Sequence, residues 1–91
     1  MKNIGGTTTF FNKDVEITSV YFRNSQQKGR FETFPKRMVL DGREYTFGEG
    51  GWRYLVQKGQ DLIKLFDVSD GQTDFRLRLD HDNHWTLIGM K

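Results

Sequence analysis

The stretch from Lys36 to Phe47 constrains the fold most strongly. It reads KRMVLDGREYTF, in which two five-residue runs flank Asp41-Gly42. That dipeptide readily adopts the positive φ angles of a two-residue type I′ turn, so the stretch predicts a β-hairpin with one apolar face. The predicted cross-strand pairs are Leu40 with Arg43 and Met38 with Tyr45. Because an isolated hairpin is only marginally stable in water, the rest of the chain must supply further strands.

The length and composition indicate one small domain. A chain of 91 residues has room for a single hydrophobic core. Hydrophobic residues make up only 35% of it and aromatic residues 14%, which favours a thin sheet core built on a few large rings. Residues 1–9 are predicted to be a flexible leader and residues 10–91 a single β domain. The chain has no cysteine and no run of 18 apolar residues, so we expect a cytoplasmic protein that contacts no membrane.

Short β-rich segments separated by turn residues continue to the end of the chain. They predict an all-β fold, a small antiparallel meander of five to seven strands that closes into a partly open barrel or a strongly bent sheet. In VEITSVYF (15–22) the apolar positions change parity, which predicts a β-bulge or bend near Ser19. Pro35 lacks an N–H, so it ends a strand, marks a bulge or lies on an edge.

Residues 52–68 have two possible structures. Apolar residues in this stretch fit helical spacing fairly well. However, Gly59 interrupts the pattern, and no Ser, Thr, Asp or Asn caps the start of the would-be helix. We therefore prefer two strands, 52–57 and 62–68, joined by a turn at 58–61. A short helix within 52–60 is the alternative.

Alternation along these strands separates two faces. The predicted core face carries Leu55, Leu62, Phe66, Val68, Phe75, Leu77, Leu79, Ile88 and Met90. The other face carries Trp52, Tyr54, Val56, Ile63, Leu65, Arg76, Arg78, Trp85 and Leu87. The same register places Asp67 opposite Asp74, an unfavourable pair of like charges, so either both carboxylates are well solvated or the register differs from this one.

The second face suggests binding, with five candidate residues: Trp52, Tyr54, Arg76, Arg78 and Trp85. The leading hypothesis is a non-catalytic interaction module that binds a protein partner, or itself as a homodimer, through this aromatic face or an exposed edge strand. The alternative is a single-stranded nucleic-acid-binding barrel, in which bases stack on the rings and arginines reach phosphates. A purely structural role is also open: the strands before residue 35, or the partner subunit of a homodimer, would cover the face, and Arg78 would stack on Trp85.

No catalytic, cofactor or metal site is predicted. Asp80 and the run His81-Asp82-Asn83-His84 have a spacing that can ligate a transition metal, but Asp, Asn and His are also ordinary turn formers. A hydrolase or metal enzyme would need His81 and His84 to meet in a pocket. The three serines lie in no nucleophile motif.

Three short motifs carry a resemblance to known proteins. They are Pro35-Lys36-Arg37, Gly42-Arg43-Glu44-Tyr45 and Trp85-Thr86-Leu87. Their order resembles that in small all-β bacterial domains of unknown function, which carry P-x-R, G-R-x-Y and terminal W-x-L patterns. The resemblance spans roughly residues 30–90, implies an all-β fold, and implies no activity or site residues.

Overall fold

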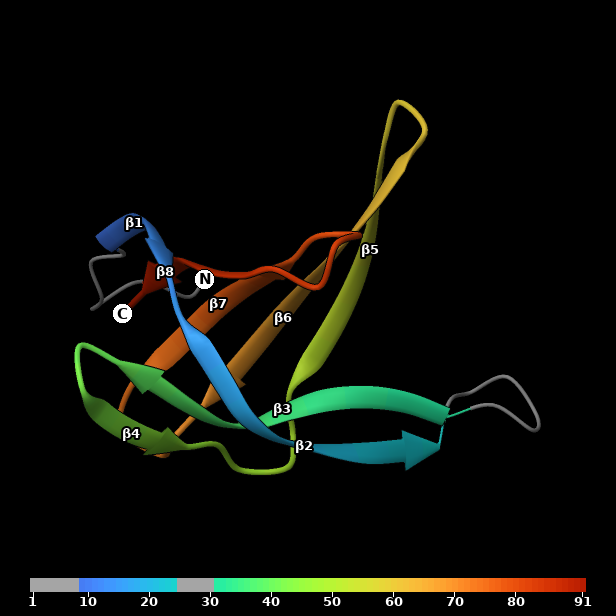
Figure 1. Cartoon of the computed structure of the whole chain (residues 1–91). Helices are drawn as coiled ribbons and strands as arrows, with labels where there is room; N and C mark the ends of the chain where they lie inside the picture. The colour runs from blue at the N-terminus through green and yellow to red at the C-terminus, as the bar shows by residue number, and fades with distance from the viewer. Residues whose placement is uncertain (1–8, 25–30) are drawn as a thin grey trace.

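The computed structural model describes residues 9–24 and 31–91, which fold into two antiparallel sheets (Figure 1). The strands are β1 (Thr9–Asp14), β2 (Glu16–Asn24), β3 (Phe31–Leu40), β4 (Arg43–Thr46), β5 (Trp52–Lys58), β6 (Asp61–Ser69), β7 (Asp74–Leu79) and β8 (Trp85–Met90). The predicted all-β class is confirmed. The described residues contain no helix, and thus none that could span a membrane.

The strand number and the connectivity differ in part from the prediction. The eight strands exceed the predicted five to seven, since residues 9–14 add the edge strand β1. The predicted leader, residues 1–9, lies outside the described residues except for Thr9, which pairs with Met90. One sheet has the order β1-β8-β7-β6-β5 and the other β2-β3-β4, so the described strands form two open sheets and no closed barrel.

The hydrophobic core lies between the two sheets. The three-stranded sheet and the segment after it contribute Phe34, Met38, Leu40 and Phe47, and the five-stranded sheet contributes Phe66, Val68, Phe75, Leu77 and Leu87. Aromatic rings join the layers: the Phe34 and Phe66 ring centres lie 5.5 Å apart, edge to face. A few large rings supply much of the contact, as the composition indicates.

The hairpin at Asp41-Gly42 forms as predicted. Both residues have positive φ, 53° and 77°, as the type I′ turn requires. Leu40 pairs with Arg43, and Met38 with Tyr45. The apolar face of this ribbon, which carries Met38 and Leu40, faces the core.

The β-bulge predicted near Ser19 from the change of parity is present in the structure. The register of β2 against β3 shifts on both sides of Ser19, and Val20 then pairs with Pro35. Pro35 does not end its strand: β3 continues to Leu40 as the middle strand of its sheet. The irregular pairing beside Pro35 accommodates the missing N–H.

Residues 52–68 form the two strands β5 and β6, and the helical alternative is wrong. A two-residue turn, Gly59-Gln60, joins them, with Gly59 at φ 62°. The turn explains the glycine that interrupted the helical pattern, since a positive φ costs glycine little.

The register of β6 against β7 differs from the prediction by two residues. Phe66 opposes Leu77 instead of Phe75, and Asp67 opposes Arg76 instead of Asp74. The loop between these strands begins at Asp70, whose carboxylate accepts hydrogen bonds from the N–H groups of Gln72 (2.9 Å) and Thr73 (2.8 Å). A shift of two preserves parity, so the predicted faces of β6 and β7 are kept.

Candidate functional site

Four of the five candidate residues share one surface. We call it the outer face: the face of the five-stranded sheet that points away from the three-stranded sheet. Across this face Trp52 pairs with Asp67 and Asp67 with Arg76, while Tyr54 pairs with Leu65 and Leu65 with Arg78. Trp52 is 69% exposed and Tyr54 43%. The predicted grouping of these two rings with two arginines is therefore what the structure contains.

Trp85 lies on the opposite side of the sheet, against the core, and its predicted place on the outer face is wrong. Its ring centre lies 5.3 Å from that of Phe66. The cause is a bulge in β8: Arg76 pairs with Gly89, but Leu77 pairs with Leu87, so Ile88 is an extra residue. One extra residue moves every side chain before it to the other face.

The same bulge corrects three further predictions. Leu87 is fully buried in the core instead of lying on the outer face. Ile88 lines a surface groove instead of the core. Arg78 pairs with Thr86, so the predicted stacking of Arg78 on Trp85 does not form.

Both outer-face arginines are paired with aspartates. Arg76 Nε and Nη2 donate to Asp67 Oδ1 and Oδ2 at 2.6 and 2.7 Å, and these bonds raise the pKa of Arg76 above its ordinary value. Arg78 Nε lies 3.2 Å from Asp80 Oδ1, in an ion pair that lacks hydrogen-bond alignment. Arg76 also lies 5.7 Å from the Tyr54 ring centre. The cationic charge that would attract phosphate is thus largely compensated.

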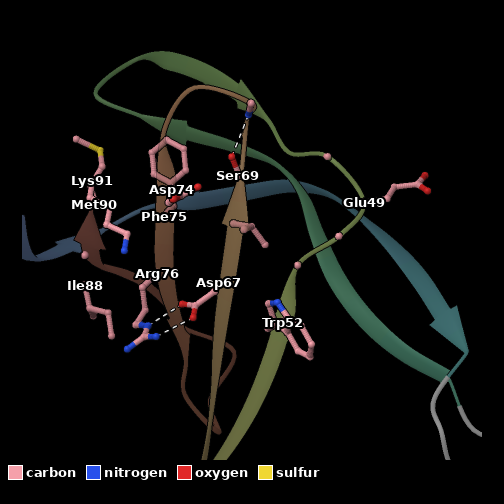
Figure 2. A pocket seen from close by; sticks show the side chains of 16 residues that line it. Glu49, Trp52, Asp67, Ser69, Asp74, Phe75, Arg76, Ile88, Met90 and Lys91 are labelled. Atoms are coloured by element: carbon pink, nitrogen blue, oxygen red, sulfur yellow. Dashed lines mark hydrogen bonds and ion pairs between the residues drawn. The ribbon is translucent and has the colours of Figure 1, made fainter. Parts of the chain in front are cut away.

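A groove of about 970 Å³ runs beside the Arg76–Asp67 ion pair (Figure 2). The loop Gly48–Gly51 and Trp52 border it on one side, and Arg76 and Ile88 contribute to the rest of its lining. The loop lies close to β6, since a Cβ on Gly51 would be 2.7 Å from the Asp67 carbonyl oxygen. On its other side the loop is bound to β2, because Arg23 Nη1 donates to the Gly51 carbonyl at 2.8 Å. The loop thereby fixes where β5 begins.

Several polar groups of the groove already have hydrogen-bond partners within the protein. The Ser69 hydroxyl accepts a hydrogen bond from the Gly71 N–H at 3.0 Å, and no described histidine lines the groove to act as its base. Asp67 is occupied by Arg76.

The histidine turn brings together part of the predicted cluster. Ligand atoms of Asp80, Asp82 and His84 lie within 4.8 Å of one another, and His81 is not among them. His84 Nε2 lies 2.8 Å from Asp14 Oδ1. Exposed turn carboxylates often lie this close without binding a cation, so this geometry supports neither a metal site nor the His81–His84 pocket that an enzyme would need.

Among the strands that the structure describes, β5 is an edge strand, with β6 as its single hydrogen-bonded neighbour. The two-residue turn makes Lys58 and Asp61 a hydrogen-bonded pair. Hydrogen-bonded and non-hydrogen-bonded pairs then alternate along the hairpin. The backbone N–H and C=O groups of Arg53, Leu55 and Gln57 therefore point to the free side of β5, which we call the β5 edge.

The other three sheet edges carry features that hinder pairing. The register of β1 shifts between Phe10 and Lys13, and that of β2 shifts around Ser19. β4 has only four residues, two of them charged. β5 pairs without any register shift over seven residues, and its centre, Tyr54 to Val56, is uncharged. It lacks the bulges, shortness and central charges that protect natural edge strands.

The β5–β6 hairpin projects from the rest of the molecule (Figure 1). Leu55 and Leu62, predicted to be core residues, are 54% and 43% exposed, since their part of the hairpin extends past the core. Alternation along a strand predicts the face of a residue but not what covers that face. Val56 on the outer face is exposed too, so apolar side chains are uncovered on both faces of the hairpin.

A second exposed apolar group was not predicted as a site. Phe22 and Phe31 are exposed near the ends of β2 and β3, and Val20 is exposed in the middle of β2. Phe22 and Phe31 lie near residues 25–30 in the sequence, which are outside the described part of the chain.

Comparison with known proteins finds no significant match to this chain. No protein-family model matches the chain, and no curated protein or solved structure is significantly similar to it. The resemblance to small bacterial all-β domains therefore stays a prediction.

Proposed function

We propose that this chain is a non-catalytic interaction module that binds a protein through the β5 edge and the side chains beside it. The observation that carries the proposal is the combination found on β5: backbone groups of Arg53, Leu55 and Gln57 that no described strand pairs, with exposed apolar side chains on both faces of the same strand. The partner is either another protein or a second copy.

Such a strand supplies two sources of binding energy. An added strand forms main-chain hydrogen bonds with the edge, and its alternating side chains contact those of β5. Trp52 offers a large, mostly exposed ring at the start of the edge, and aromatic residues are frequent at the energetic centres of protein interfaces. Burial of Tyr54 and Leu55 would remove further apolar surface from water.

The nucleic-acid alternative has less support. Phosphate binding by Arg76 would compete with a bidentate bond to Asp67, and binding by Arg78 with the nearby Asp80 carboxylate. Trp85, one of the three rings in that hypothesis, packs against the core. Two rings remain, beside arginines whose charge is compensated.

Site-specific photo-crosslinking in the cells that produce the protein tests the proposal. A photoreactive phenylalanine analogue replaces Tyr54, and a matched sample carries it at Thr46, an exposed position of β4. We expect position 54 to give a discrete covalent adduct with one protein, identified by mass spectrometry, and position 46 to give none. Equal labelling from both positions, or no adduct from position 54, would contradict the proposal.

A further inference from the structure

The order of residues along the β5 edge points to a particular partner. We infer that a second copy of this chain binds there, with its β5 antiparallel to the first and a two-fold axis at Leu55. The inference rests on the proposed function, because it names the occupant of the same edge. In this arrangement the five-stranded sheets of the two copies join into one continuous sheet.

The backbone geometry of the edge is symmetric. A two-fold axis between antiparallel edge strands is perpendicular to the sheet, so opposed residues lie on the same face. The residues whose N–H and C=O groups point outward are Arg53, Leu55 and Gln57, and they are symmetric about Leu55. With the axis at Leu55, each of these residues opposes another outward-pointing residue, and all seven residues of β5 are paired.

The side chains are complementary in this register. The opposed pairs are Trp52 with Lys58, Arg53 with Gln57, Tyr54 with Val56, and Leu55 with Leu55. Trp52 and Lys58 form a cation–π pair across the strands, and Tyr54 with Val56 is an aromatic and β-branched pair, which is favourable in sheets. No two like charges are opposed, although the strand carries two cations, Arg53 and Lys58.

Neighbouring registers fit less well. An axis at Tyr54 would leave Gln57 and Lys58 opposite Gly51 and Gly50, which precede the strand. An axis at Val56 would place Trp52 and Arg53 opposite the turn residues Gln60 and Gly59. Each shift removes pairs at both ends of the interface, so Leu55 is the centre that uses the whole edge.

Cysteine substitutions test the register directly, because the chain has no cysteine of its own. Opposed residues of antiparallel strands lie within disulfide reach, with Cα atoms about 4.5–5.5 Å apart. We expect Leu55→Cys to form a disulfide-linked dimer under mild oxidation. Tyr54→Cys and Val56→Cys should crosslink when mixed but not alone. Self-crosslinking of Tyr54→Cys or Val56→Cys in place of Leu55→Cys would overturn the register.

Sedimentation measurements test the association without crosslinks. The full chain should sediment as a monomer–dimer equilibrium. Leu55→Glu opposes two carboxylates at the axis and should raise the dimer dissociation constant by about tenfold or more. Lys64 opposes position 55 within the monomer, so the folded monomer tolerates the new carboxylate. Leu62→Glu is the matched control: it is exposed on the same face of the hairpin but lies on β6, and should leave the constant unchanged.

The outcomes separate this inference from the proposed function. A dimer that responds to Leu55→Glu and crosslinks through Leu55→Cys supports both. A monomer at all concentrations, with no Leu55→Cys crosslink, overturns the second copy as partner. If the crosslinker at position 54 then labels a different protein, the proposed function stands without this inference. If it labels nothing above the Thr46 control, both are wrong.

Discussion

Asp67 and Arg76 lie directly opposite each other on β6 and β7, and two hydrogen bonds of 2.6 and 2.7 Å join the carboxylate to the guanidinium. The pair lies on the outer face, in the cross-strand row that begins at Trp52. It also resolves the conflict in the predicted register, in which Asp67 would have faced Asp74. A bidentate pair of this kind fixes the orientation of both side chains and leaves their two opposite charges side by side at the surface.

The Asp67–Arg76 pair should make a small, salt-sensitive contribution to stability. Both side chains are partly exposed, so we expect a coupling free energy of about 0.5–1 kcal/mol from a double-mutant cycle of Asp67→Asn and Arg76→Gln. Urea unfolding at low and high salt measures it, and high salt should reduce it. A coupling near zero at low salt would mean that the two groups do not form this pair in solution.

Gly51 should be intolerant of a side chain, whereas Gly50 should not. A Cβ at Gly51 would lie 2.7 Å from the Asp67 carbonyl oxygen and 2.9 Å from Val68 Cγ1, so the backbone must move. We expect Gly51→Ala to lower the free energy of unfolding by about 1–3 kcal/mol. Gly50→Ala meets nothing within 4 Å and serves as the control. Equal stabilities of the two variants in urea unfolding would contradict the close approach of this loop to β6.

The two tryptophans should behave differently. Trp85 packs on Phe66, so Trp85→Ala should destabilise the fold by about 2–4 kcal/mol, whereas Trp52→Ala should change it by less than about 0.5 kcal/mol. In Trp52→Phe, the remaining Trp85 should emit at shorter wavelength and resist acrylamide quenching. In Trp85→Phe, Trp52 should be readily quenched in dilute protein. If Trp85 were quenched more readily than Trp52, the bulge in β8 would not lie at Ile88.

Asp70 gives the turn between β6 and β7 a pH dependence. Hydrogen bonds from the N–H groups of Gln72 and Thr73 lower its pKa in the folded state below the ordinary value of 3.8. The ionised form therefore contributes stability above about pH 4, and this contribution disappears as the pH falls through the lowered folded-state pKa. Asp70→Asn keeps an acceptor but removes the charge. Its stability deficit in urea unfolding should be present at pH 7 and should shrink progressively as the pH falls below about 4. A deficit that does not change with pH would exclude this role.

Single-stranded DNA should bind weakly. With both outer-face arginines paired to aspartates, we expect a dissociation constant weaker than about 100 µM for a short oligonucleotide at physiological salt. Fluorescence anisotropy at two salt concentrations measures this. Tight binding that weakens steeply with salt would favour the nucleic-acid alternative over the protein-binding proposal.

The local turns were predictable because their chemistry is encoded in adjacent residues. Asp41-Gly42 defines its hairpin completely, and the change of parity around Ser19 locates a bulge. The register of β6 against β7 was not predictable from alternation, since a shift of two residues leaves every side chain on the same face. The opposition of Asp67 to Asp74 was the available signal, and charge pairing with Arg76 is the arrangement that relieves it.

The rest depended on information that alternation does not contain. Nothing in WTLIGM distinguishes a regular strand from one with an extra residue at Ile88, and that residue decides whether Trp85 faces solvent or the core. The exposure of Leu55 depends on how far the β5–β6 hairpin extends beyond the second sheet. The place of β5 at a sheet edge depends on the strand order, which short-range patterns do not specify.

Amide hydrogen exchange along β5 tests the central claim most directly. Among the β5 amides, those of Arg53, Leu55 and Gln57 point to the free edge, while those of Tyr54 and Val56 bond to β6. At a few micromolar the first group should exchange rapidly and the second slowly, and at several hundred micromolar the first group should become protected as the edge pairs. Protection of Arg53, Leu55 and Gln57 that stays low at every concentration, in the presence of the cellular extract as well, would contradict the claim that the β5 edge is the binding surface.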